Sequence, residues 1–288
     1  MPIFFGKLLR EGSTTNLDVC YGICYSNKCW KLFDIQEGMC MSERLTHKVA
    51  VITGAASGFA KATAELFAKL DQCNLVLLDI DETGLEATAN ICRDFGADVI
   101  TLKADVTRTE SFEKALDECM TNYGKVDFLI NYAGGAVKIA PIEEMSDEMI
   151  QKIINLNLMS TIVSCRTFAP QFKKQGYGKI INVSSVCDRR SWPGWSVYSA
   201  AKAAVNAFTK CLYTELRPHG IGVTLLVPGG SNTSFQNAEG VNKFVWDEAM
   251  AVRPEHFADM VYQTCALTKG GCVSEMLVFG LAQDIAGF

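Results

Sequence analysis

Apolar runs rich in β-branched residues alternate with longer segments of helical periodicity from residue 48 onward. The runs are almost continuously apolar, as expected for strands that are buried on both faces of a sheet. They predict strands at residues 49–53, 74–79, 98–105, 127–131, 179–184, 222–227 and 275–279. Helices are predicted between the strands, for example over residues 60–70 and 110–124.

Regular alternation of strands and helices indicates right-handed βαβ crossovers. We therefore predict a doubly wound parallel sheet that is covered by helices on both faces. This is a Rossmann-like, three-layer α/β/α fold, and we expect it to occupy residues 45–288 as a single domain.

Residues 1–44 show no clean period of either kind and form an N-terminal extension. Met41 can be the natural start, in which case the preceding residues are a disordered or artefactual leader. Alternatively, the segment is an arm that packs on a partner subunit, and its aromatic content favours this interpretation. The aromatic residues are Phe4, Phe5, Tyr21, Tyr25 and Trp30.

Composition and charge narrow the classes of function. The chain has 288 residues, of which 49% are hydrophobic, enough for one substantial core. Its formal net charge of -5 supplies no basic field, so we expect no nucleic-acid partner and no anionic membrane partner. No apolar run approaches the roughly 18 residues of a membrane span, and the N-terminus lacks the pattern of a secretory signal. We expect a soluble, cytoplasmic protein.

The twelve cysteines do not predict a metal site. Eight are scattered singly through predicted helices and strands, where a thiol in a reducing compartment packs as a small apolar side chain. The other four lie in the first 40 residues without the paired spacing of zinc ligands. We therefore predict that the protein binds no metal.

Ser185, Tyr198 and Lys202 are the strongest candidates for catalysis. Tyr198 and Lys202 are four positions apart, so on a helix they lie on one face, separated by one turn. A nearby ammonium favours the phenolate, and we expect Lys202 to lower the pKa of Tyr198 from its usual value of about 10. Ser185 follows a predicted strand and can hold a carbonyl or alcohol oxygen at the same point. The Tyr–Lys spacing alone is common on solvated helix faces, so the neighbouring motifs decide between the two interpretations.

A glycine-rich turn at residues 53–60 joins the first predicted strand to a helix. Its glycines let the backbone turn tightly and approach a pyrophosphate, whose charge the helix N-terminus stabilises. The next strand ends at Asp79, where a carboxylate can accept hydrogen bonds from both hydroxyls of an adenosine ribose. Because that carboxylate repels a 2′-phosphate, we predict NAD(H) rather than NADP(H). Lys61 is the nearest cation, and we expect it to be solvated on the first helix.

With these motifs assembled, residues 45–288 resemble the short-chain dehydrogenase/reductase family over essentially the whole domain. The turn TGAASGFA is similar to the family's TGxxxGxG, with Ala60 in place of the last glycine. NYAG at residues 131–134 is similar to NNAG, with Tyr132 in place of the second asparagine. PGGSNT at residues 228–233 is similar to PGxxxT. Either departure, Ala60 or Tyr132, can loosen cofactor binding without abolishing the fold.

The resemblance implies an NAD-dependent alcohol dehydrogenase or ketoreductase. It implies that Asn157, on the long fourth helix, holds a water that links Lys202 to solvent, and that Lys202 binds the ribose hydroxyls. The implied catalytic residues are Asn157, Ser185, Tyr198 and Lys202. The implied cofactor-binding residues are Gly54, Ser57, Gly58, Phe59, Asp79, Asp105, Val106, Asn131, Ala133, Gly134, Tyr198, Lys202, Pro228, Gly229 and Thr233.

Two segments are expected to select the substrate. One, at residues 189–196, precedes Tyr198, and the other is a substrate lid at about residues 229–251. Their apolar side chains can wall a large cavity, which indicates a bulky hydrophobic secondary alcohol or ketone. The bacterial hydroxysteroid dehydrogenases of the family are similar in cofactor choice and size. An alternative is that these side chains only pack the lid or a subunit contact. They are Trp192, Trp195, Phe235, Phe244, Val245, Trp246 and Met250.

The family resemblance also implies a homodimer or homotetramer, built on apolar residues of the fourth and fifth helices. These residues are Leu156, Met159, Val163, Ala203, Phe208 and Leu212. A different class of function stays open, namely an NAD(H)-binding sensor or scaffold protein with little catalysis. The changes at Ala60 and Tyr132 motivate that alternative, and the intact catalytic residues argue against it.

Overall fold

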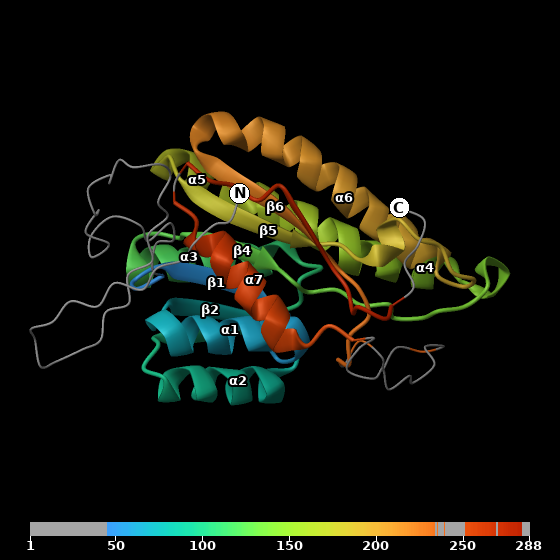
Figure 1. The fold of residues 1–288 in the computed structure, drawn as a ribbon, viewed down its shortest axis with the longest axis horizontal. Coiled ribbons are helices and arrows are strands. Elements are labelled where there is room, and N and C mark those ends of the chain that lie inside the picture. The colour runs from blue at the N-terminus through green and yellow to red at the C-terminus, as the bar shows by residue number, and fades with distance from the viewer. Residues whose placement is uncertain (1–44, 234, 236–238, 240–250, 269, 284–288) are drawn as a thin grey trace, which may run out of the picture. The chain divides into compact units, whose positions relative to one another are not determined.

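The computed structural model describes residues 45–233, 235, 239, 251–268 and 270–283 (Figure 1). These residues form a seven-stranded sheet with the order β3-β2-β1-β4-β5-β6-β7, in which all neighbouring strands pair in parallel. The predicted doubly wound sheet is thereby confirmed. The strands are β1 Val49–Thr53, β2 Asn74–Asp79, β3 Val99–Lys103, β4 Phe128–Asn131, β5 Gly178–Val183, β6 Ile221–Pro228 and β7 Glu275–Val278. The α-helices are α1 Gly58–Asp71, α2 Glu82–Asp94, α3 Thr109–Tyr123, α4 Asp147–Ile154, α5 Ser160–Gln175, α6 Ser196–Leu216 and α7 Pro254–Ala266.

Strand positions follow the apolar runs of the sequence. β1 and β2 have the predicted bounds, and β4 to β7 differ from prediction by at most one residue at either end. β3 is shorter than the predicted segment 98–105. It ends early because Asp105 Oδ1 accepts hydrogen bonds from the Thr107 amide at 2.9 Å and the Thr107 hydroxyl at 2.7 Å, which turns the chain.

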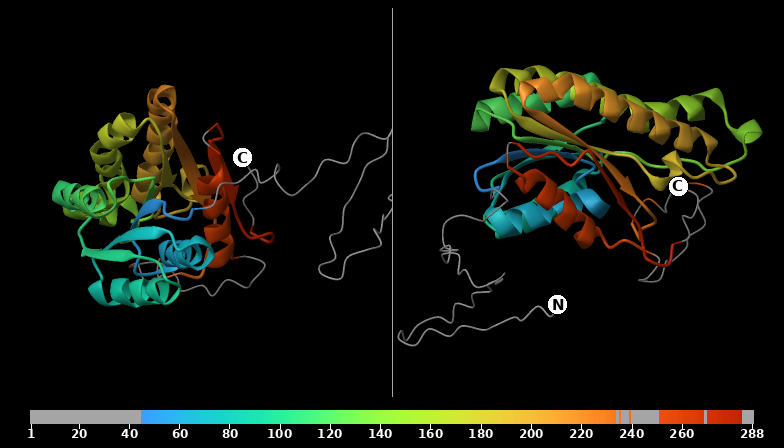
Figure 2. Two further views of the ribbon diagram at one scale, coloured as in Figure 1. Left: turned by 90° about the vertical axis from the view of Figure 1, so that its left-hand side faces the viewer. Right: turned by 45° about the horizontal axis from the view of Figure 1, so that its top comes forward.

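Alternate strand residues face two different helical layers. Ala50 and Ile52 of β1 pack in the core that α1, α2 and α7 cover. Val49 and Val51 pack on the other face, against α3, α5 and α6. Figure 2 shows helices on both sides of the sheet. Burial on both faces explains why the strands read as continuous apolar runs rather than as an alternating pattern.

The helical segment that carries Asn157 differs from the prediction of one long helix. α4 is followed directly by a π-helical turn at Asn155–Met159, and α5 begins after it. A π turn adds a residue to the helical path and is frequent at functional sites. A short 3-10 turn, η3 at Val186–Asp188, likewise interrupts the path from β5 to α6.

Two predicted regions fall largely outside the described residues, namely the N-terminal extension at 1–44 and most of the lid at 229–251. Within the described part of the chain, no helix combines the length and apolar character needed to cross a bilayer. Six of the eight cysteines described are buried and all eight are free thiols, as predicted for apolar packing.

Candidate active site

The carboxyl ends of β1, β2, β4, β5 and β6 meet at one edge of the sheet because the strands are parallel. β1 has β2 on one side and β4 on the other, which makes the crevice between β1 and β4 the point where sheets of this type bind ligands. Most of the predicted site residues lie at or after these strand ends. They are Gly54, Ser57, Gly58 and Phe59 after β1, Asp79 at the end of β2, Ala133 and Gly134 after β4, Ser185 after β5, and Pro228 and Gly229 at the end of β6.

Ser185, Tyr198 and Lys202 come together from two elements. Ser185 directly precedes η3, and its Oγ accepts a hydrogen bond from the Cys187 amide at 3.2 Å. Tyr198 and Lys202 lie one turn apart on α6. All three are buried, and a hydrogen bond joins the Ser185 hydroxyl to the Tyr198 phenol. The sequence-based prediction that these residues share one site agrees with this geometry.

The pKa of Tyr198 differs from the prediction. Burial raises the pKa of Tyr198 well above its ordinary value of 10, and the nearby Cys187 and Asp188 raise it further. The hydrogen bond from Ser185 acts in the opposite direction, but it does not outweigh desolvation. The predicted lowering of this pKa by Lys202 is therefore wrong, because spacing along a helix gives no measure of desolvation. At neutral pH Tyr198 is a neutral phenol that can donate a proton.

Lys202 is also held in a desolvated position. Its Nζ donates a hydrogen bond to the Val183 carbonyl at 2.9 Å and lies 5.8 Å from the centroid of the Tyr198 ring. Burial lowers the pKa of Lys202 from 10.5 to about 8, although Cys187 and Asp188 act to raise it. Burial therefore makes the Lys202 ammonium easier to deprotonate than that of a lysine in water.

Asn157 joins the site through the loop after β4. Its Oδ1 accepts a hydrogen bond from the Gly135 amide at 3.0 Å, and its Nδ2 donates to the Gly135 carbonyl at 2.8 Å and to the Ile153 carbonyl at 2.9 Å. A methyl group on Gly134 would lie 2.8 Å from Asn157 Oδ1 and 3.3 Å from Lys202 Nζ. The absence of a side chain at Gly134 thus lets Asn157 and Lys202 approach the same strand end.

The glycine-rich turn has the geometry of an anion site. Gly54 and Gly58 have positive φ angles of 75° and 59°, which favour glycine. α1 begins at Gly58 with no side-chain cap at Ser57 and no acidic residue in its first turn. α2, by contrast, is capped by Asp81 and carries Glu82 in its first turn. The N-terminus of α1 therefore suits a phosphate better than that of α2 does.

The substitution at Ala60 is accommodated by the core. Ala60 is buried in the layer between the sheet and α1, so its methyl group packs without opening the turn.

The side chain of Phe59 stacks on Phe257 of α7, with ring centroids 4.4 Å apart. Lys61, predicted to be solvated, forms a half-exposed ion pair with Glu65 at 3.8 Å.

Asp79 and Asp105 border the position expected for adenosine. Asp79 Oδ2 accepts a hydrogen bond from the Ala56 amide at 2.9 Å, and Oδ1 accepts one from the Asp81 amide at 2.9 Å. These bonds fix the carboxylate beside the glycine-rich turn. Asp105 follows β3, the strand next to β2, and Val106 after it is buried against the sheet.

The NYAG segment uses its side chains to connect elements. Asn131 Nδ2 donates to Asn182 Oδ1 of β5 at 2.9 Å, so this amide points into the sheet. The Tyr132 hydroxyl is hydrogen-bonded to Thr63 Oγ1 of α1 at 2.7 Å. The amide of Ala133 donates to Thr53 Oγ1 of β1 at 3.0 Å. Tyr132 thus links the end of β4 to α1.

The loop after β6 completes the crevice. The Gly229 amide donates to the Val278 carbonyl of β7 at 2.7 Å, and a Cβ on Gly229 would lie 2.7 Å from Phe279 Cβ. Thr233 approaches the glycine-rich turn, since its Cβ and Cγ2 lie 3.5 Å from the position of a Cβ on Gly58. An uncapped helix N-terminus, a close-approaching threonine and the carboxylate of Asp79 together fit a dinucleotide.

Aromatic rings surround the phenol of Tyr198. Trp195 and Phe235 stack with centroids 6.1 Å apart and an interplanar angle of 17°. Both rings also pack edge-on against Tyr198, at centroid distances of 5.7 Å and 5.6 Å. Trp192 belongs to the same apolar cluster. The other predicted wall residues, Phe244, Val245, Trp246 and Met250, lie outside the described residues.

Asp188 is a site residue that the sequence did not predict. Its side chain is completely buried at the end of η3, three residues after Ser185. The signal was present in the sequence, because a carboxylate follows directly on the small and apolar run SSVC. Only the fold places this carboxylate near Tyr198 and Lys202.

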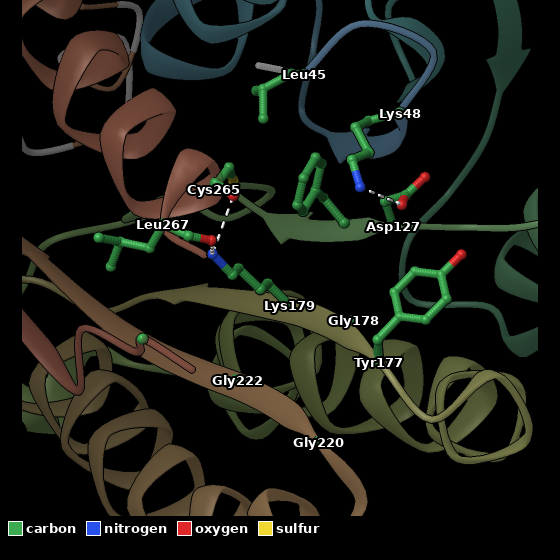
Figure 3. Close-up of a pocket in the computed structure, with 12 residues that line it drawn as sticks. Leu45, Lys48, Asp127, Tyr177, Gly178, Lys179, Gly220, Gly222, Cys265 and Leu267 are labelled. Carbon is green, nitrogen blue, oxygen red and sulfur yellow. Dashed lines mark hydrogen bonds and ion pairs between the residues drawn. The ribbon is translucent and has the colours of Figure 1, made fainter. Parts of the chain in front are cut away.

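A small cavity lies at the opposite edge of the sheet, at the amino ends of the strands (Figure 3). Its charged residues have structural partners. Lys179 Nζ donates to three carbonyls at the end of α7, and Asp127 pairs with Lys48 at 3.5 Å. Parallel sheets bind their ligands at the carboxyl ends of the strands and not at this edge. The crevice at the carboxyl edge is therefore the better candidate for the active site.

Comparison with known proteins assigns the family. Residues 48–243 match the family model described as short chain dehydrogenase. The chain belongs to the short-chain dehydrogenase family. Among relatives of this dehydrogenase, a diacetyl reductase that forms (S)-acetoin, from Staphylococcus epidermidis, is 36% identical over 189 residues, 65% of this chain and 73% of the relative. A 3β-hydroxysteroid dehydrogenase from Eggerthella lenta is 34% identical over 212 residues, 73% of this chain and 79% of the relative.

Solved structures of similar proteins agree with the observed fold. A 3-ketoacyl-(acyl-carrier-protein) reductase from Brucella melitensis, complexed with NADH, has a TM-score of 0.74 and 29% identity, covering 84% of this dehydrogenase and 100% of that chain. An alcohol dehydrogenase from Thermococcus sibiricus, complexed with 5-hydroxy-NADP, has a TM-score of 0.73 and 26% identity. The match covers 82% of this dehydrogenase and 97% of that chain. The dehydrogenase is accordingly an oxidoreductase.

Proposed function

We propose that this dehydrogenase transfers a hydride between NAD(H) and a bulky, apolar secondary alcohol or ketone, with hydroxysteroids as the favoured class. The observation that carries the proposal is the buried group of Ser185, Tyr198 and Lys202, with aromatic rings packed against the phenol. A buried phenol beside an apolar wall suits a substrate whose oxygen is its main polar group.

Proton transfer follows from the charge states in the site. In ketone reduction, the neutral phenol of Tyr198 donates its proton to the substrate oxygen while Ser185 holds that oxygen. In alcohol oxidation, Tyr198 must first lose its proton, so oxidation should become faster as the pH rises. Lys202 faces the crevice beside Gly134, where an ammonium can hold ribose hydroxyls. When bound, the nicotinamide supplies or accepts the hydride.

The preference for NAD(H) rests on charge at the end of β2. Asp79 is held beside the glycine-rich turn, and Asp81 and Glu82 follow it closely. Glu82 is paired with Lys103 at 3.0 Å, so Asp79 and Asp81 are the carboxylates that disfavour the additional phosphate of NADP(H). Similar dehydrogenases have been solved with NADH and with an NADP derivative, so the family alone does not decide between the two.

The preference for a bulky substrate rests on the aromatic wall. Trp192, Trp195 and Phe235 lie in one apolar cluster with Tyr198. The hydroxysteroid dehydrogenase of Eggerthella lenta supports a large alicyclic substrate, whereas the diacetyl reductase of Staphylococcus epidermidis represents a small one. We favour the former because two stacked rings beside the phenol offer more apolar surface than a four-carbon diketone can cover.

We further propose that residues 45–288 form the catalytic domain with a lid at about 229–251, in a cytoplasmic homodimer or homotetramer. Exposed apolar residues on α6 and at the end of the π turn support the oligomer, among them Ala203 and Met159. Leu212, which the sequence assigned to a subunit contact, is instead buried in the chain's own core. Its register on α6 points it into this core, on the side of α5, rather than outward.

A panel of substrates tests the proposal. Steroid ketones, small diketones and a 3-ketoacyl thioester are each assayed with NADH and with NADPH by the change in absorbance of the nicotinamide. We expect the highest kcat/KM for a steroid ketone with NADH. Turnover of the diketone alone, or a preference for NADPH, would refute the substrate or the cofactor assignment. Cofactor binding without turnover of any member would favour the sensor or scaffold alternative.

A further inference from the structure

Asp188 is a buried carboxylate with three specific partners. Its side chain has no exposed surface. Oδ2 lies 2.8 Å from Asn206 Nδ2 and 2.9 Å from Ser184 Oγ, and Oδ1 accepts a hydrogen bond from Arg189 Nε at 3.1 Å. A carboxylate is costly to bury, and this one is retained only because polar groups surround it.

These contacts attach Asp188 to the elements that carry the proton-transferring residues. Asn206 lies one turn beyond Lys202 on α6, so Tyr198, Lys202 and Asn206 follow one another along a single face of the helix. Ser184 Oγ also lies 2.9 Å from the Lys202 carbonyl. On the other side, the Asp188 amide donates to the Ser185 carbonyl at 2.9 Å. Asp188 therefore joins the turn after β5 to the helix that holds Tyr198 and Lys202.

Few charges surround the site. Among the described residues, two titratable groups besides Tyr198 and Lys202 themselves act on the pKa values of these two residues. They are Cys187 and Asp188, both in η3. Arg189, from the end of the same turn, pairs with Asp188, and its side chain is 25% exposed. Arg189 also contacts Glu275 of β7, and Glu275 pairs with Lys210 of α6 at 3.4 Å. Asp188 is thus the inner carboxylate of a chain of alternating charges that leads to the surface.

We propose that Asp188 is a positioning residue for proton transfer: it locks the Ser185 turn onto α6 and supplies a fixed negative charge beside Tyr198 and Lys202. The catalytic role of Asp188 rests on the proposed function. Its effect on the geometry and charge of the site rests on its hydrogen bonds and its ion pair with Arg189. The negative charge favours the protonated forms of both neighbours, the phenol and the ammonium. A protonated phenol is the form needed for ketone reduction, which is the direction that Asp188 assists.

The test measures Lys202 directly, without turnover. Lysine side chains are isotope-labelled, their titration is followed by NMR, and the Lys202 signal is assigned from its loss in Lys202→Arg. In Asp188→Asn we expect Lys202 to titrate at a lower pH than in the wild-type chain. In Arg189→Gln we expect a higher pH, because the compensating positive charge is removed. Glu215→Gln, at an exposed carboxylate of α6 outside this chain of charges, is the matched control, and we expect it to leave the titration unchanged.

The opposite signs separate an electrostatic role from structural damage. If Asp188→Asn does not fold, Arg189→Gln, at a partly exposed position, still decides the outcome. An unchanged titration in both variants, or shifts of the same sign, would overturn the proposal.

Turnover supplies the second measurement. With a ketone accepted by the wild-type chain, Asp188→Asn should lower kcat by roughly tenfold and leave the KM for cofactor nearly unchanged, because the reacting groups are misplaced while the glycine-rich turn is intact. An unchanged kcat would overturn the positioning role. If no alcohol or ketone is turned over but the Lys202 shifts occur, the proposed function fails while the electrostatic part of this inference stands.

Discussion

Desolvation has the largest effect on the pKa values of the titratable residues in the crevice of this dehydrogenase. The spacing of Tyr198 and Lys202 along the sequence predicted that they share a helix face, and they do. Their pKa values could not be predicted in the same way, because burial raises one and lowers the other. Burial depends on the whole packed structure rather than on the distance between two residues in the chain.

Burial of the Lys202 ammonium should cost folding stability. The difference between the ordinary pKa of 10.5 and the value of about 8 in the fold corresponds to about 3 kcal/mol. The hydrogen bond to the Val183 carbonyl is lost on substitution, so we expect Lys202→Met to stabilise the cofactor-free chain by about 1 to 2 kcal/mol at pH 7. Chemical denaturation measures this difference.

The pH dependence gives the sign of the Lys202 effect. The folded chain releases the Lys202 proton at a lower pH than the unfolded chain does, so wild-type stability rises with pH between about 8 and 10.5. The advantage of Lys202→Met should therefore be complete below pH 8 and disappear toward pH 10.5. Lys210→Met, at an exposed position of the same helix, should show no such dependence. A constant difference across this range would contradict the burial of a charged Lys202.

The absence of a side chain at Gly134 can be tested by substitution. A methyl group there meets Asn157 Oδ1 at 2.8 Å and Lys202 Nζ at 3.3 Å, whereas a methyl group on the adjacent Gly135 meets no atom within 4 Å. We expect Gly134→Ala to lower kcat on the order of 100-fold by displacing the ammonium, and Gly135→Ala to have little effect. Steady-state kinetics of the two variants checks this. Equal effects would show that the loop, and not the contact with Lys202, is responsible.

At the scale of elements, the strands could be predicted because their pattern is set locally. Strands buried on both faces must be continuously apolar, and the observed bounds follow those runs. The π turn at Asn155–Met159 could not be predicted, because it accompanies a long-range contact. Asn157 pairs with both backbone groups of Gly135, 22 residues away, and no period in the sequence records this.

The contact between Tyr132 and Thr63 connects β4 to α1. The hydroxyls are 2.7 Å apart, and Thr63 also donates to the Phe59 carbonyl at 2.8 Å. We expect Tyr132→Phe to destabilise the fold by about 1 kcal/mol without weakening cofactor binding, because the phenol lies on the core side of the sheet edge. A double-mutant cycle with Thr63→Val measures the coupling, which should also be about 1 kcal/mol. Zero coupling, or a cofactor affinity that falls with Tyr132→Phe, would contradict this purely structural role.

For the molecule as a whole, topology explains why separate motifs form one site. Parallel strands bring Gly54, Asp79, Gly134 and Ser185 to one edge although they span more than a hundred residues of sequence. The motifs and their order were therefore sufficient to place these residues at one edge of the sheet. The identity of the substrate was not predictable to the same degree, since several of the predicted wall residues follow Thr233 and belong to no regular pattern.

The oligomeric state of the molecule can be tested by substitutions on its exposed helix faces. Ala203 of α6 is exposed, and so is Met159 at the end of the π turn. We expect light scattering to give two or four times the mass of one chain, and Ala203→Arg to reduce it. Leu70→Arg, at an exposed apolar position of α1 in the other helical layer, should not. A monomeric wild-type chain would contradict the predicted oligomer.

Replacement of Tyr198 by phenylalanine tests whether the phenol is the proton donor of this dehydrogenase. The substitution removes one oxygen and leaves the ring packed against Trp195 and Phe235. Turnover of the best ketone and the dissociation constant for NADH are measured for the wild-type chain, for Tyr198→Phe and for Tyr213→Phe on the same helix. We expect kcat to fall by about a thousandfold in Tyr198→Phe alone, with the NADH dissociation constant unchanged in all three. Near-normal turnover by Tyr198→Phe would contradict the proposed chemistry.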